Sequence, residues 1–178
     1  MDEALAYLME NGLAWAREQR ERHRPEAMAL EPQERAVFEP FFEAELLDEV
    51  RFKSVPKVEN PGFYSVLAAM GQPLPMDFTA THGITFGDTV LLSERYLRSG
   101  EARLSLLFHE MVHVVQYRLL GMEGFLRAYV TGWAENGFEY RAIPLERQAY
   151  DLQHRFEDNA AAAFSVRDEV TRRLASGA

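Results

Sequence analysis

Apolar residues recur with a helical spacing through the first third of the chain. Residues 3 to 22 place leucines among polar side chains, and Pro25 is expected to end that helix. Residues 33 to 47 carry a second apolar stripe, in which Pro40 predicts a kink or a restart. The pattern therefore predicts an N-terminal helical region at about residues 1–48.

A shorter period follows in the middle of the chain. Residues 50–55 alternate with the period of a β-strand, and residues 78–92 are rich in β-branched and apolar side chains. Gly87 and Asp88 interrupt the second stretch and predict the turn of a hairpin. Between the two stretches, residues 63–70 read as a short helix.

The strongest helical pattern spans residues 102–120, with apolar side chains nearly all round the axis. A helix of that kind is normally buried, and Gly121 is expected to end it. Residues 132–137 read as a loop, and further helices are expected at residues 125–131, 144–158 and 160–174. The order of elements predicts an α+β fold that is mainly helical, with a small sheet or β-hairpin before the buried helix.

Composition narrows the class of protein. A chain of 178 residues without a linker is expected to form one domain over residues 1–178. The net charge of −9 argues against nucleic acid as a partner. No run approaches the roughly 18 apolar residues of a membrane span, and the acidic start does not resemble a signal peptide, so no membrane partner and a cytoplasmic location are expected. Because cysteine is absent, any metal site must use His, Asp or Glu.

Candidate chemistry lies within the buried helix, where the chain reads His109-Glu110-Met111-Val112-His113. Histidines at i and i+4 share one helix face, so both rings can reach one ion, and neutral imidazole suits Zn²⁺. Glu110 projects about 100° away and can reach a metal-activated water without ligating the metal. The alternative is two core histidines and a glutamate that are satisfied by neighbouring polar groups.

A catalytic zinc site needs a third protein ligand. The metzincin extension of the motif is excluded, because Gln116 and Leu119 stand where its Gly and third His would fall. Glu146 is favoured, since it lies in the first turn of a predicted helix, near inward-facing apolar residues. A first-turn glutamate is also explained by the helix dipole alone. Glu139 and His154 are the alternatives for the third ligand.

The motif and the segments around it resemble two groups of known proteins. His109, Glu110, His113 and Glu146 resemble the gluzincin arrangement of zincin metallopeptidases. Residues 80–90 and 107–116 are similar to the metallopeptidase core domain of bacterial proteins associated with contractile injection systems and toxins. The resemblance implies a zincin core with a small sheet, an active-site helix and a later helix that completes the site. It also implies that the strand near residues 85–92 is the edge that binds extended substrate.

The expected function is that of a zinc-dependent metallopeptidase acting on a peptide or protein substrate, with Glu110 as general base. Tyr140, Tyr150 and Arg141 are candidate hydrogen-bond donors to the oxyanion, and Gln116 is a candidate partner of the ligands. One alternative is a zincin-like module that binds metal or protein without catalysis. Another is a metal-free helical interaction protein.

Overall fold

The computed structural model describes residues 3–72, 74, 76–96 and 99–176. Within these ranges the fold is mainly helical, with one three-stranded sheet, which confirms the expected α+β class. The α-helices are α1 (Glu3–His23), α2 (Pro32–Phe38), α3 (Ala44–Glu49), α4 (Tyr64–Ala69), α5 (Gly100–Glu135), α6 (Pro144–Asp158) and α7 (Val166–Ser176). The strands are β1 (Arg51–Val55), β2 (Gly83–Phe86) and β3 (Thr89–Ser93), and short 3₁₀ turns are η1 (Arg24–Glu26), η2 (Phe78–Ala80), η3 (Glu94–Tyr96) and η4 (Tyr140–Ala142).

The sheet has β3 at its centre, parallel to β1 and antiparallel to β2. Gly87 and Asp88 form the predicted hairpin turn, and Gly87 adopts a φ of +67° that favours glycine. The strand expected at residues 78–81 is wrong. The Asp77 carboxylate accepts from the Thr79 amide and closes a 3₁₀ turn there.

Helix α5 runs through the middle of the molecule and turns sharply at Gly121. This residue has φ 69° and ψ 167°, outside the helical region, so the first straight segment ends where the sequence predicts. The helix resumes at once and continues to Glu135, and the loop expected at residues 132–137 is therefore wrong over residues 132–135. The second segment folds back beside α1, with which α5 is in contact.

Two other helix boundaries are set by local residues. Pro40 lies between α2 and α3, so the predicted helix over residues 33–47 restarts instead of continuing. Helix α7 begins at Val166, not at residue 160 as expected. The Asn159 side chain accepts from the Ala161 amide and turns the chain, and Phe164 is then buried in the core against Phe41 and Phe108.

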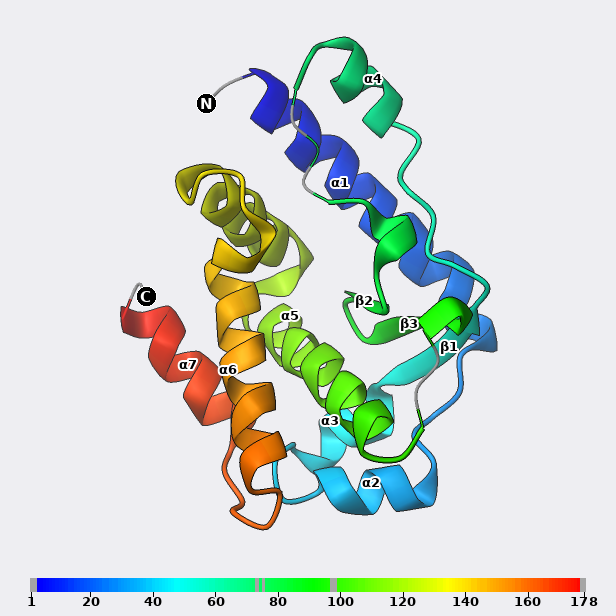
Figure 1. Cartoon of the computed structure of the whole chain (residues 1–178), viewed down its shortest axis with the longest axis vertical. Helices are drawn as coiled ribbons and strands as arrows, with labels where there is room; N and C mark the ends of the chain where they lie inside the picture. Colours follow the sequence, from blue (N-terminus) through cyan, green and yellow to red (C-terminus); the bar gives the residue numbers. More distant parts are fainter. Residues whose placement is uncertain (1–2, 73, 75, 97–98, 177–178) are drawn as a thin grey trace.

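The layers place α5 between two groups of elements (Figure 1). Helices α6 and α7 lie on one side of it, and α1 and the sheet lie on the other. Both sides contribute apolar side chains that bury the first segment of α5. No helix of the described residues is long and apolar enough to cross a membrane.

A bidentate ion pair fixes α1 to the hairpin turn. The Arg20 guanidinium donates from Nε and Nη2 to the two carboxylate oxygens of Asp88, each at 2.8 Å, and Arg24 lies 3.1 Å from Oδ1. Burial raises the pKa of Asp88, but the arginines outweigh that effect and hold the pKa below its ordinary value.

We expect Asp88→Asn to lower the free energy of unfolding by about 1 kcal/mol at neutral pH, since it keeps the shape and removes the charge. A carboxylate with a lowered pKa stabilises the fold above its ordinary pKa of about 3.9 and stops doing so as pH falls through the lowered value. Urea unfolding at pH 7 and pH 3 measures this. A difference between variant and wild type that does not shrink at pH 3 contradicts the assignment.

Candidate metal centre

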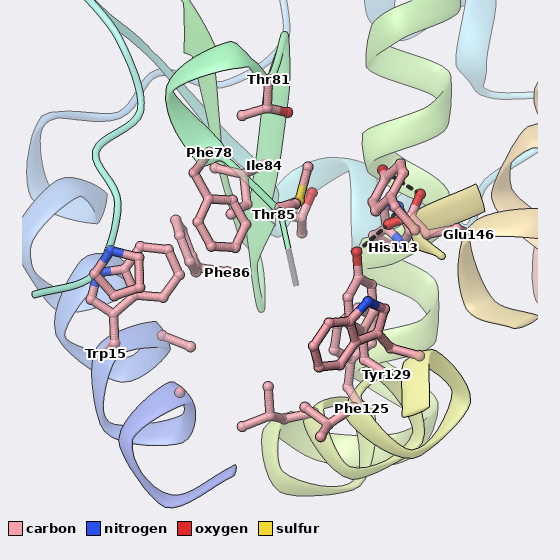
Figure 2. Close-up of a pocket in the computed structure, with 18 of the residues that line it drawn as sticks. Trp15, Phe78, Thr81, Ile84, Thr85, Phe86, His113, Phe125, Tyr129 and Glu146 are labelled. Atoms are coloured by element: carbon pink, nitrogen blue, oxygen red, sulfur yellow. Dashed lines mark hydrogen bonds and ion pairs between the residues drawn. The ribbon is translucent and has the colours of Figure 1, made fainter. Parts of the chain in front are cut away.

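The first segment of α5 and the first turn of α6 bring three metal-ligating side chains together. His109 and His113 project from the same face of α5, one turn apart, and Glu146 faces them from α6. All three are buried, with at most 6% of each residue exposed. Figure 2 shows His113 and Glu146 pointing toward each other at one end of a cavity.

The separations of these atoms match those around a tetrahedral ion. The two Nε2 atoms of His109 and His113 are 3.2 Å apart, and each lies 3.5 Å from a Glu146 carboxylate oxygen. Ligands at about 2.0–2.1 Å from zinc, at the corners of a tetrahedron, are about 3.3 Å apart. The spacing of the two imidazole nitrogens therefore fits two ligands of one ion, and the Glu146 carboxylate, with Oε2 near His109 and Oε1 near His113, lies close enough to offer a third.

Two glutamines determine which imidazole nitrogen carries the proton. His109 Nδ1 lies 2.9 Å from Gln153 Oε1, and His113 Nδ1 lies 2.8 Å from Gln116 Oε1. The NH₂ group of each amide fixes its orientation. Gln153 Nε2 donates to Ser105 Oγ, and Gln116 Nε2 donates to the Leu145 carbonyl. Both Nδ1 atoms then donate, so in the neutral form of each ring Nε2 presents a lone pair.

These two lone pairs cannot hydrogen-bond to each other across 3.2 Å. In this tautomeric state a cation between the nitrogens satisfies both, and the Glu146 carboxylate balances its charge. The local field favours such a cation. Burial lowers the pKa of His113, yet the Glu146 charge outweighs it and raises that pKa to about 9. Burial likewise raises the pKa of Glu146, and the imidazoles outweigh it and hold the pKa below its ordinary range.

Tyrosines hold the Glu146 carboxylate from its other side. Tyr129 donates to Oε1 at 2.8 Å, and Tyr140 donates to Oε2 at 2.6 Å. The start of α6 is also fixed by backbone packing, because a Cβ at Gly132 of α5 would lie only 2.7 Å from Pro144 Cδ. The two helices approach closely at this point because residue 132 has no side chain.

Glu110 lies beside the ligands without joining them. Its Oε2 accepts from Thr85 Oγ1 on β2 at 2.7 Å. A Cβ at Gly83 would lie 2.6 Å from Oε1, so the glycine leaves room for this oxygen. Glu110 is 4% exposed, and burial raises the pKa of its carboxyl group above the ordinary value.

Two cavities meet at this cluster. An apolar pocket of about 110 Å³ lies between α1, β2 and the second segment of α5. A polar groove of about 630 Å³ lies between the segment before β2, the start of α5 and α6. Both are lined by His109, Glu110 and Tyr140. His109 and Glu110 therefore border the groove, whereas His113 and Glu146 line the apolar pocket alone.

The structure brings most of the predicted site residues together. His109, His113 and Glu146 form the ligand group, and Gln116 contacts His113 as expected. The alternatives for the third ligand lie elsewhere, since Glu139 and His154 are both exposed and outside the group.

The predicted oxyanion donors differ in their surroundings. The Tyr140 hydroxyl is committed to Glu146, whereas the Tyr150 ring lines the polar groove 4.5 Å from the His109 ring. Arg141 lies over the Tyr150 ring at 5.6 Å. Tyr150 is thus the better placed of the two tyrosines for donation to a molecule in the groove.

The predicted edge strand needs correction. Residues 89–92 belong to β3, the central strand, so they cannot pair with a further chain. Strand β2 is one of the two edges of the sheet, the other being β1, and it contacts α5. Of the segment predicted at residues 85–92, only Thr85 and Phe86 lie on that edge.

Three residues that contribute to the site are not among those predicted from the sequence. Gln153 is seven residues after Glu146, which is two helical turns, so its place on the same face of α6 was readable. Thr85 lies on the predicted hairpin, but its contact with Glu110 depends on how the sheet packs against α5. Tyr129 reaches Glu146 only because α5 turns at Gly121.

No family model, curated protein or solved structure matches the chain.

We expect Glu146→Gln to weaken zinc binding by more than about 100-fold, because loss of an outer partner of a ligand already costs 10- to 100-fold. Glu139→Gln is the matched control and should bind zinc as the wild type does. Competition with a chromogenic chelator measures both affinities. If Glu139→Gln shows the larger loss, the third ligand has been assigned wrongly.

We expect Gln116→Leu to weaken zinc binding by about 10- to 100-fold, since His113 Nδ1 loses its acceptor. Gln33→Leu, an exposed substitution of the same kind on α2, is the control. Melting of the metal-free chain separates a positioning role from a purely structural one. Unchanged zinc affinity in a destabilised Gln116→Leu variant would show that the amide serves the fold alone.

Proposed function

We propose that this chain is a zinc-dependent metallopeptidase that hydrolyses a peptide or protein substrate. The observation that carries the proposal is the spacing of the two Nε2 atoms and the Glu146 carboxylate at 3.2 and 3.5 Å, with Glu110 beside them. Two imidazoles and one carboxylate with a free corner are the donor set of a catalytic zinc site. The proposal includes a cytoplasmic location, which rests on the sequence expectation alone.

His109, His113 and Glu146 would hold the ion. When bound, zinc supplies Lewis acidity that polarises a carbonyl and activates a water molecule. The neutral tautomers set by Gln153 and Gln116 keep both Nε2 atoms available for this role.

Glu110 supplies the proton transfer. Thr85 donates to Oε2 and holds the carboxylate in one orientation, and the missing side chain at Gly83 leaves Oε1 unobstructed. The carboxylate accepts a proton from the attacking water and delivers a proton to the leaving amine. Tyr150, on the groove wall, is the candidate donor to the oxygen that becomes negative in the transition state.

We expect Glu110→Gln to reduce peptide hydrolysis by about 10²- to 10⁴-fold while it retains zinc and the fold, because the amide keeps the shape and cannot accept the proton. The measurement is a peptide-library digest at neutral pH, with and without a chelator, followed by kinetics on one cleaved peptide. Glu139→Gln, on the exposed residue before η4, is the control and should cleave as the wild type does.

Two outcomes of this experiment would contradict the mechanism. One is cleavage that a chelator does not inhibit, and the other is a Glu110→Gln variant as active as the wild type. A zinc-loaded chain that cleaves nothing in a broad library would favour the non-catalytic zincin-like module.

A further inference from the structure

The polar groove beside the metal cluster carries charges of opposite sign at its two ends. Among the described residues that line it, Arg141 is the one lysine or arginine, and Glu101 and Glu157 are the acidic residues apart from Glu110. Glu101 lies in the first turn of α5, and Glu157 lies at the far end of α6 from Arg141. The groove therefore has a cationic end at the start of α6 and an acidic end at the start of α5.

Arg141 has no anionic partner in this groove. Its guanidinium forms no hydrogen bond or ion pair with the described residues and instead lies over the Tyr150 ring, with the guanidinium carbon 5.6 Å from the ring centroid. A guanidinium offers five N–H donors in a fork that fits the two oxygens of a carboxylate. Arg141 is therefore available to an anionic group of a molecule bound in the groove.

The backbone that carries Arg141 is fixed next to the metal cluster. The residue before it, Tyr140, donates to the Glu146 carboxylate. Ile143, two residues after it, is completely buried, and its amide donates to the Tyr140 carbonyl and closes η4. Arg141 thus projects from a restrained turn, which fixes where its side chain starts relative to Glu146.

The distances allow Arg141 to reach a molecule that lies on the cluster. The Tyr150 ring centroid is 4.5 Å from that of His109 and 5.6 Å from the Arg141 guanidinium carbon, so that carbon is at most about 10 Å from the His109 ring. Successive Cα atoms of a peptide are about 3.8 Å apart. A carboxylate within one or two residues of the reacting carbonyl can therefore contact Arg141.

We propose that Arg141 binds a carboxylate of the substrate close to the cleaved bond, with the Tyr150 ring packed under the guanidinium. The inference rests on the proposed peptidase function and names its substrate class, which is peptides with a negative charge within one or two residues of that bond. The C-terminus or an acidic side chain supplies the carboxylate. Because Glu101 and Glu157 repel it at the other end of the groove, Arg141 also sets the direction in which the peptide lies.

Three kinds of N-acetylated tetra-alanine peptide test the proposal and separate the two sources of the carboxylate. One ends in a carboxylate, one ends in a carboxamide, and one ends in a carboxamide and carries a single glutamate, placed at each position in turn. We expect a carboxylate-bearing peptide to bind the zinc-loaded Glu110→Gln chain at least about 10-fold more tightly than the neutral peptide, because hydrogen bonds to charged groups are worth about that factor. Calorimetry measures the affinities.

The pattern of affinities identifies the source. Tighter binding of the peptide with a free C-terminus assigns the site to a terminal carboxylate, and tighter binding of a glutamate peptide assigns it to an acidic side chain. Added salt should reduce either preference, since Arg141 is exposed and its charge is screened. Equal binding of all the peptides, or binding of none, overturns the proposal.

Variants locate the effect. Arg141→Gln should abolish the preference for a carboxylate, and Arg141→Lys should retain part of it, because lysine keeps the charge and loses the fork of donors. Arg147→Gln, an exposed substitution on α6 outside the groove, is the matched control and should keep the whole preference. A preference that survives in a folded Arg141→Gln variant overturns the proposal.

The same titrations on the chelated wild type separate this inference from the proposed function. A chain that retains no zinc or cleaves no peptide contradicts the proposed function, yet the chelated chain should still prefer carboxylate peptides through Arg141, which is not a zinc ligand. Cleavage with equal kcat/KM for neutral and carboxylate peptides, unchanged in Arg141→Gln, overturns this inference and leaves the proposed function standing.

Discussion

Two imidazole nitrogens that face each other across 3.2 Å, with a carboxylate 3.5 Å from each, impose the strongest constraint on this structure. Because Gln153 and Gln116 accept from the opposite ring nitrogens, Nε2 is the atom of each ring that is left to bind a proton or a metal ion. Electron-rich atoms buried together are unfavourable unless a cation lies between them. The group could therefore hold a metal ion, and without one a proton on His113, whose pKa Glu146 raises to about 9, satisfies the same atoms.

Much of the surrounding fold serves to hold that cluster in place. The close approach of Gly132 and Pro144 brings the first turn of α6 against α5, and Gln116 links the two helices by donating to the Leu145 carbonyl. On the opposite side, Thr85 of β2 holds Glu110 next to the ligands. The ligands, the candidate base and their supports thus come from regular elements, which restrict their motion.

Local sequence patterns are sufficient to predict the parts of the site that lie on a single helix. The spacing of His109 and His113 places both on one face, and the position of Glu146 in a first helical turn was enough to favour it over Glu139. What depends on tertiary packing was not predictable. Tyr129 reaches the site only after α5 turns at Gly121, and the direction of that turn is set by packing against α1.

The same distinction applies to the fold. The Gly87-Asp88 pair predicts the hairpin turn, but the order of strands, which places β3 at the centre and β2 at one edge, depends on where β1 pairs. Side-chain capping by Asp77 and Asn159 overrode the strand and helix patterns of the residues that follow them.

The central claim is that His109, His113 and Glu146 bind one zinc ion. Anomalous diffraction on both sides of the zinc absorption edge, from crystals grown with zinc and without chelator, tests it most directly. The account predicts one strong peak about 2.0–2.2 Å from both Nε2 atoms and a Glu146 oxygen. No peak between these atoms, or a zinc ion bound by other residues in their place, would contradict it.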